Sequence, residues 1–257
     1  MYSSNEKAID IRPREHRLQC HDLSVLVAYA SLLTSLPPGR KAYSLKEAYD
    51  ANTTPSHWLT HKIVVSLTHH KMIKLLPATA LSHCKIVIEH RNDDLHLKSI
   101  LREINRRKVS YLDKDLLSIT RHYLKANLHA HISEQLHNAG INLDIREGDF
   151  ETFTAALERQ SLSELCMIVW QTVQSLTRPD LRFYSLSEDS LSGIAEQIED
   201  SCLEQLARYE SKNRAIKPFK FSKIKRSSLS LVLFNSVLGI NNNYYKRSLQ
   251  EIWNQYA

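Results

Sequence analysis

Glycine is scarce in this chain, with 5 residues among 257. Globular proteins use glycine at roughly 7% of their positions, so the chain holds about a quarter of the usual share. The glycines, at positions 39, 140, 148, 193 and 239, cannot be combined into a GxGxxG or GxxxxGKS/T phosphate loop. Sandwiches and barrels of β-strands need many tight turns, so the shortage disfavours these folds and favours a mainly α protein.

Cysteine and long apolar stretches are also rare. The four cysteines, at positions 20, 84, 166 and 202, form no CxxC pair. This pattern disfavours a zinc knuckle or a disulfide framework and predicts reduced, buried thiols. The longest apolar stretch, Val25–Leu33, is far shorter than the roughly 20 residues of a membrane span, and the first residues contain no apolar signal core. We therefore expect a cytoplasmic protein with no membrane partner.

Positive charge is concentrated at the two ends of the chain. The net charge is +6, but residues 1–143 carry +7, residues 144–210 carry −9 and residues 211–257 carry +8. Clusters of Lys and Arg attract the phosphates of nucleic acids and release counterions on binding. Contact with a polyanion at both ends is one interpretation of this division. Three solvated surfaces of unequal composition are the other.

Residues 22–90 contain the signals of three helices and a β-hairpin. The apolar run after Asp22 predicts a buried helix that ends at Pro37-Pro38-Gly39. The capping box Ser44-Leu-Lys-Glu47 starts a short second helix. Thr53 or Thr54 is predicted to cap a third helix with Pro55 at its first position, and this helix carries an apolar stripe with four-residue spacing.

Two short apolar runs, 71–76 and 84–89, then suit a hairpin. The order helix, short helix, turn, helix and hairpin resembles the winged helix-turn-helix superfamily. This resemblance implies that the third helix enters the major groove with its amino-terminal side chains at the base edges. Those side chains are Ser56, His57, Thr60 and His61, and Lys71, Lys74 and Lys85 would lie near phosphates. Winged helices also bind proteins, so protein contact stays open as the alternative.

The middle of the chain is predicted to be helical and architectural. Apolar spacing predicts helices over about 92–108, 112–138, 149–158, 161–178 and 188–209. The helix over 112–138 either pairs with the same helix of a second copy in a dimer or packs inside the monomer. It contains His122, His129, His131 and His137, which we interpret as polar surface residues because no ligand set with zinc spacing accompanies them. The acidic face of the last helix is either solvated or docked against a basic end.

Seven cations lie within 15 residues that contain no acid. They are Lys212, Arg214, Lys217, Lys220, Lys223, Lys225 and Arg226. Phe219 and Phe221 are interleaved with them. Such a segment would make binding strongly dependent on salt if its cations met phosphates. A basic linker without a ligand is the alternative.

An apolar run over 229–238 follows this segment, and then Gly239-Ile240 and a predicted helix over 241–253. With Asn243, Tyr245, Arg247, Leu249 and Glu251-Ile252, this order resembles the C-terminal helix-turn-helix of Fis-like regulators. The resemblance implies a tight turn at Gly239, where positive φ is needed. It also implies that five polar side chains face the groove or its phosphates: Asn241, Asn242, Asn243, Lys246 and Arg247. Asn can read adenine and Arg can read guanine through paired hydrogen bonds.

The sequence contains no motif of a known catalytic or metal site, so we expect no enzyme activity, cofactor or metal. A nuclease whose carboxylates meet only in the folded chain stays open. We predict a mainly α protein with a winged-helix domain (1–91), a helical core or assembly domain (92–210), and a basic arm with a C-terminal helix-turn-helix (211–257). The predicted function is a DNA-binding transcriptional regulator or a replication or maintenance factor of a mobile element. Duplex DNA is favoured over RNA as the partner, and a homodimer is open. The alternative is a non-enzymatic helical adaptor of a larger nucleoprotein assembly.

Overall fold

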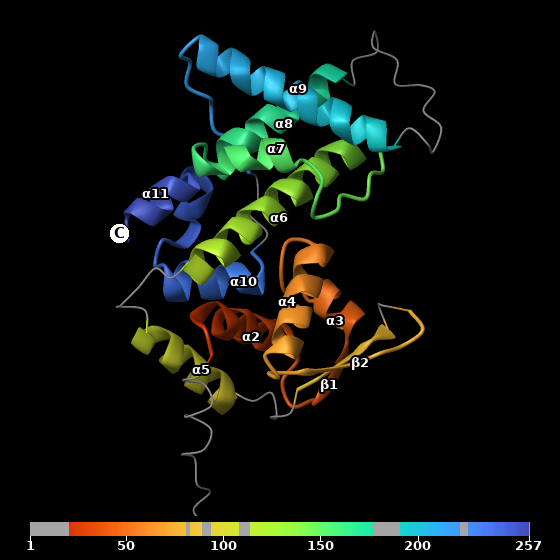
Figure 1. Ribbon diagram of the computed structural model, residues 1–257, viewed down its shortest axis with the longest axis vertical. Helices are drawn as coiled ribbons and strands as arrows, with labels where there is room; N and C mark the ends of the chain where they lie inside the picture. The colour runs from red at the N-terminus through yellow and green to blue at the C-terminus, as the bar shows by residue number, and fades with distance from the viewer. Residues whose placement is uncertain are drawn as a thin grey trace, which may run out of the picture.

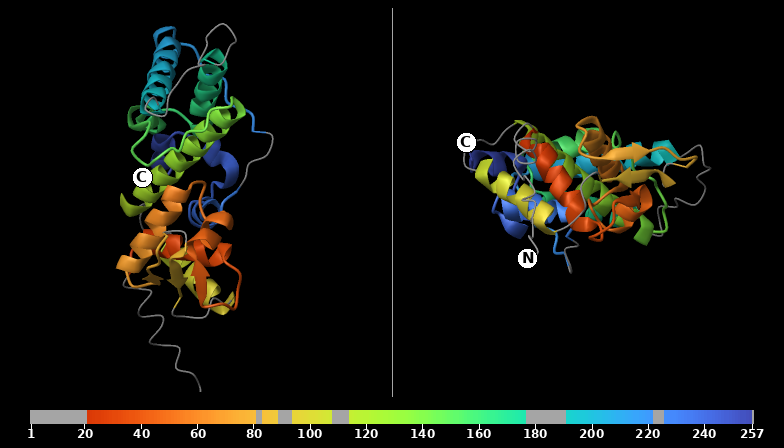
Figure 2. Two further views of the ribbon diagram at one scale, coloured as in Figure 1. Left: turned by 90° about the vertical axis from the view of Figure 1, so that its right-hand side faces the viewer. Right: turned by 90° about the horizontal axis from the view of Figure 1, so that it is seen from below.

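The computed structural model describes residues 21–80, 83–88, 94–107, 114–176, 191–221 and 226–256. The protein is mainly helical with one small sheet (Figure 1), which confirms the predicted fold class at this level. Figure 2 shows the N-terminal elements at one end of the long axis and helix α9 (Leu191–Ser211) at the other, with the C-terminal segment between them. None of the described helices combines the length and the apolar character needed to cross a bilayer.

The N-terminal elements are three helices and a three-stranded antiparallel sheet with strand order β1-β3-β2. The helices are α2 (Leu23–Ser35), α3 (Leu45–Asp50) and α4 (His57–His69), and the strands are β1 (Ala42–Ser44), β2 (Lys74–Leu76) and β3 (Lys85–Val87). Strands β2 and β3 occupy the predicted hairpin. Strand β1 adds to it, because the residues before the second helix pair with β3, with Tyr43 opposite Ile86. Both of these side chains are buried.

Local capping signals set the helix starts in this part of the chain. The Ser44 hydroxyl accepts from the amide of Glu47 (3.1 Å), and the Glu47 carboxylate accepts from the amide of Ser44 (2.6 Å), so the predicted capping box is formed. Helix α4 begins two residues later than predicted, because Ser56 rather than Thr53 or Thr54 caps it by accepting from the amide of Leu59 (3.4 Å). Helix α2 has ten buried residues among its 13, because it packs against α4, α5 (Asp94–Arg107), α6 (Lys114–Asn138) and the C-terminal segment.

The long helix α6 (Lys114–Asn138) runs through the centre of the molecule (Figure 1). It ends where Gly140 takes φ +80 and the amide of Ile141 donates to the carbonyl of Leu136 (2.8 Å), as in a Schellman cap. The helical elements that follow α6 are α7 (Glu151–Thr154), a 3-10 turn η2 (Ala155–Glu158), α8 (Leu162–Leu176) and α9 (Leu191–Ser211), and together with α6 they are here called the body. Helix α8 packs between α6 and α9.

The C-terminal segment joins the N-terminal elements to this body. A short helix, α10 (Ser228–Ser230), continues as a π-helix, η4 (Leu231–Val237), and both contact α2. A 3-10 helix, η5 (Asn241–Lys246), contacts α8, and α11 (Leu249–Asn254) contacts α6. The buried apolar side chains of all these elements form one hydrophobic cluster.

The second helix of the predicted C-terminal helix-turn-helix is corrected by the structure. The range 241–253 is divided into η5 and α11 by Arg247, which is extended (φ −123, ψ 139). Tyr244 lies inside the protein and stacks on Phe234, with ring centroids 4.0 Å apart. A capping box of Ser248 and Glu251 then begins α11. Gly239 does have the expected positive φ of +64.

Candidate nucleic-acid interface

Residues 212–226, here called the basic strap, are anchored to the body by apolar side chains. Phe219 and Phe221 pack against the buried ring of His131, with centroids 4.8 Å and 5.8 Å away. The amide of Phe219 donates to the carbonyl of Ser163 (2.9 Å), and Ile216 is buried. The strap is therefore held in place along α8 rather than extending freely from the body.

The cations of the strap point outward. Lys212, Arg214, Lys217, Lys220 and Arg226 are all exposed. Within the described parts of the chain none of the five forms an ion pair. Lys223 and Lys225 lie outside the described residues. The described strap thus presents positive charge to solvent with no carboxylate against it.

The acidic face of α9 has contacts of its own. The Glu199 carboxylate accepts from the amide of Phe153 (2.9 Å), and Glu204 pairs with Arg208 (3.3 Å). Neither acid reaches the strap through a described ion pair. The alternative in which this face docks against a basic end therefore gains no support from these two side chains.

The strap ends beside the turn between α3 and α4. The Asn52 side-chain amide donates to the carbonyl of Arg226 (2.8 Å), across 174 residues of sequence. The amides of Ser228 and Leu229 donate to the carbonyls of Asn52 (3.1 Å) and Thr53 (3.0 Å). Two segments that the sequence predicts as separate contact sites are therefore adjacent in the folded chain.

The predicted residues at the start of α4 divide into outward and inward side chains. His57 is exposed and stacks on Tyr49 at 4.6 Å. Ser56 is half-buried and uses its hydroxyl as the cap. Thr60 is only 1% exposed and shares a hydrogen bond with the hydroxyl of Thr54 (2.9 Å), so its side chain faces the interior of the protein. His61 is half-buried, and its Nδ1 atom has no hydrogen-bond partner.

The lysines predicted to touch phosphate are exposed but distant from the strap. Lys71, Lys74 and Lys85 all face solvent. Lys71 and Lys74 follow the C-terminal end of α4, whereas the strap meets its N-terminal end. The length of a 13-residue helix, about 20 Å, separates the two groups of cations.

The C-terminal polar residues lie next to the strap on a short 3-10 helix. Asn241, Asn243 and Lys246 are exposed, and Asn242 and Arg247 are half-buried. Arg247 donates to the side chain of Gln255. The buried Tyr245 contacts Phe221 of the strap at 5.0 Å. Through Tyr245, η5 contacts the strap, but with six residues it does not have the length of the predicted groove helix.

The outer face of α4 was not identified from the sequence. We define it by Trp58, Lys62, Val65 and His69, which share one side of the helix at three- and four-residue spacing. Val65 is 48% exposed and His69 is also open to solvent. Trp58 is half-buried against the ring of His129 on α6, 5.9 Å away. The three- and four-residue spacing of these residues in the sequence could have revealed this face. It could not have revealed that His129 covers Trp58 at its N-terminal end.

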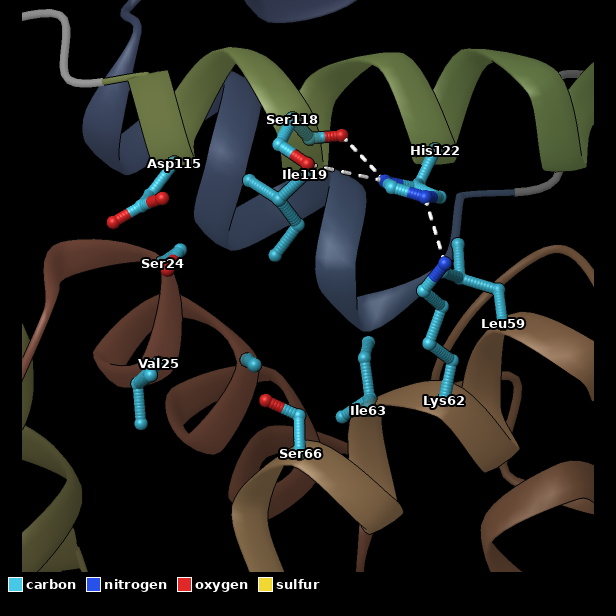
Figure 3. Close-up of a pocket in the computed structure, with 11 residues that line it drawn as sticks. Ser24, Val25, Leu59, Lys62, Ile63, Ser66, Asp115, Ser118, Ile119 and His122 are labelled. Atoms are coloured by element: carbon cyan, nitrogen blue, oxygen red, sulfur yellow. Dashed lines mark hydrogen bonds between the residues drawn. The ribbon is translucent and has the colours of Figure 1, made fainter. Parts of the chain in front are cut away.

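A pocket of about 170 Å³ lies between α2, α4 and α6 (Figure 3). Lys62 and His122 stand at one end and Asp115 at the other. His122 donates from Nδ1 to the carbonyl of Ser118 (2.7 Å), which leaves Nε2 to accept from Lys62 (2.8 Å). Lys62 also donates to Glu147 (2.5 Å). Burial, as the largest cause, lowers the pKa of His122, in keeping with a neutral ring that accepts from an ammonium group.

Two histidines of α6 correct the interpretation as surface residues. His129 is 1% exposed and His131 is 5% exposed. Burial lowers the pKa of each to about 4. His131 Nε2 donates to the carbonyl of Cys166 (3.1 Å), whereas neither ring nitrogen of His129 has a partner in good geometry. Both are buried because α4 covers α6 on one side while α8 and the strap cover it on the other.

The described cysteines, Cys84, Cys166 and Cys202, are buried free thiols, as predicted. Burial raises the pKa of Cys166, and it raises that of Cys202 to about 12. No group of three or more His, Cys, Asp or Glu side chains in the described ranges is placed to hold a metal ion. Comparison of the chain with protein-family models, with curated proteins and with solved structures finds no match.

Proposed function

We propose that this protein binds nucleic acid, duplex DNA in the first place, through phosphate contacts made by the basic strap. The observation that carries the proposal is the set of five exposed cations, without ion pairs to the described residues, on a segment anchored by Ile216, Phe219 and Phe221. An anchored backbone loses less conformational entropy on binding than a free arm does. Lysines and arginines on such a segment can replace the counterions of a phosphate backbone.

The N-terminal elements support a role as a winged helix-turn-helix unit. Their order is helix, strand, helix, helix and two strands, and the turn before α4 lies beside the strap. In this proposal α4 is the helix that meets the major groove, and Lys74 and Lys85 on β2 and β3 meet the neighbouring phosphates. A transcriptional regulator and a replication or maintenance factor both need such a unit.

A second candidate is the helical adaptor of a nucleoprotein assembly, which holds nucleic acid without reading its sequence. The partial cover on the outer face of α4 favours it, because Trp58 faces α6 while the strap stays open. The two candidates predict different sequence discrimination. A regulator should prefer some duplexes after selection from a random pool, and an adaptor should bind all of them with the same affinity.

The test is a salt titration of the full chain on a fluorescent random duplex and on single-stranded RNA. Each phosphate contact contributes a slope of about −0.9 to the plot of log K against log salt for duplex DNA. Lys217→Gln with Lys220→Gln should therefore reduce the slope by about 1.8. Lys98→Gln with Arg102→Gln removes two exposed cations from α5 and should leave it unchanged. Failure of the wild-type protein to bind either polymer at low salt would overturn the proposal.

A further inference from the structure

The outer face of α4 is covered by a contact that pairs its polar groups poorly. Five buried side-chain nitrogen or oxygen atoms in the described part of the chain have no hydrogen-bond partner. Three of them are Nε1 of Trp58 on α4 and the two ring nitrogens of His129, which packs on Trp58 from α6. A buried polar group without a partner loses its hydration and gains nothing in return, so this contact is less stable than its area suggests.

A neighbouring part of the α4–α6 contact is incompletely packed. The pocket of about 170 Å³ lies between α2, α4 and α6, and Lys62 and His122 are among the residues that line it. The direct polar link here is the chain of hydrogen bonds from His122 to Lys62 to Glu147. Lys62 and Glu147 are 43% and 46% exposed, so water can compete for both. Interfaces that stay closed are normally filled to the density of a protein interior.

The segment that supplies Glu147 is strongly acidic. Residues 144–151 contain four acids and one arginine. The Glu147 carboxylate forms an ion pair with Lys62 on the outer face of α4, and the Glu151 carboxylate forms one with Lys125 on α6. A carboxylate that binds a lysine on a groove-facing helix occupies the position that a phosphate would take, and the two compete for the same charge.

We infer that segment 144–151 and α6 form an autoinhibitory clasp on the outer face of α4, which a duplex displaces when a phosphate replaces the Glu147 carboxylate at Lys62. The inference rests on the proposed function, because it describes how the α4 surface is regulated. The strap remains open in the closed form, so first contact is made by the strap. Displacement of the clasp then uncovers Trp58 and Lys62 for the groove.

The first experiment compares Glu147→Gln with Glu134→Gln in the full chain. Both variants lose one exposed negative charge, but only Glu147 bonds to Lys62. Glu147→Gln should bind a 30-bp duplex more tightly than Glu134→Gln by about fivefold or more, the scale of a typical coupling between sites.

The second experiment follows Trp58 in a variant with Trp170→Phe and Trp253→Phe. Duplex binding should shift Trp58 emission to longer wavelength and increase its quenching by acrylamide, because the ring loses its cover. If the wild type binds no duplex, the proposed function fails. If it binds and Glu147→Gln matches Glu134→Gln, or Trp58 emission does not move, the proposed function stands and the clasp is overturned.

Discussion

Two regions of this chain carry sequence signals of a helix-turn-helix, and they fold differently. The described residues between 22 and 88 form the three predicted helices and the two hairpin strands, to which β1 is added. In residues 227–256 the first predicted helix is a short α-turn that continues as a π-helix, and the second is divided at Arg247. Local signals therefore decided the first region, whereas buried contacts decided the second.

The reason lies in how the two regions are stabilised. In the N-terminal region, caps at Ser44 and Ser56 and a single apolar face on α4 all favour the same helix limits. In the C-terminal region, the adjacent Tyr244 and Tyr245 are both buried, Tyr244 against Phe234 and Tyr123 and Tyr245 against Phe221. Adjacent side chains lie 100° apart around an α-helix, and here both must reach buried partners on different sides. The predicted α-helix is therefore replaced by the tighter 3-10 helix η5.

Removing the Tyr244 ring should have the largest effect. Tyr244→Ala should lower the free energy of unfolding by about 3 to 5 kcal/mol, as for other buried aromatic residues. Asn243→Ala, at an exposed neighbouring site, should change it by less than about 0.5 kcal/mol. Urea unfolding followed by circular dichroism measures both. Equal effects of the two variants would contradict the view that this stack sets the C-terminal fold.

Acidification should affect both regions through separate histidines. His129 contacts Trp58 of α4, and His131 contacts the Phe residues of the strap. Each has a native pKa of about 4 against an ordinary value of 6.5, so the unfolded chain binds more protons as the pH falls through this window. Each histidine should therefore lower the free energy of unfolding by up to about 1.4 kcal/mol for each unit by which the pH falls between 6.5 and 4.

The measurement is the urea midpoint between pH 7 and 5, where most carboxylates have not yet titrated. Lys125, Asp149 and Glu151 also act on His129, so the slope is compared between variants rather than taken as absolute. His129→Leu and His131→Leu should each make the urea midpoint less dependent on pH, and His137→Leu should leave this dependence unchanged. A pH-independent midpoint in the wild type would show that neither imidazole is held neutral by burial.

The smallest expected effect compares the two capping boxes. Ser44→Ala and Ser248→Ala each remove the acceptor for the amide of a glutamate three residues later. Each should cost about 1 kcal/mol, while Ser175→Ala on the exposed surface of α8 should stay within about 0.5 kcal/mol. If Ser44→Ala is costly and Ser248→Ala is not, buried contacts alone place the break before α11.

Most helix limits could be predicted because their signals are local. The caps at Ser44 and Ser161 and the glycine after α6 act through hydrogen bonds within a few residues. The capping box of Ser248 and Glu251 has the same form, and its residues are present in the sequence. The resemblance to a Fis-like helix-turn-helix instead predicts one continuous helix across Ser248. The third strand could not be predicted, because the three residues of β1 become a strand only by pairing with β3.

By itself, the sequence determined the mainly helical class, the helix starts at Ser44 and Ser161 and the concentration of cations near the C-terminus, because composition and capping act at short range. Only the tertiary structure decided that the strap meets the turn before α4, that Thr60, His129 and His131 are buried, and that Glu147 holds Lys62. Burial and charge pairing depend on which remote helices meet, and no local spacing of residues carries that information.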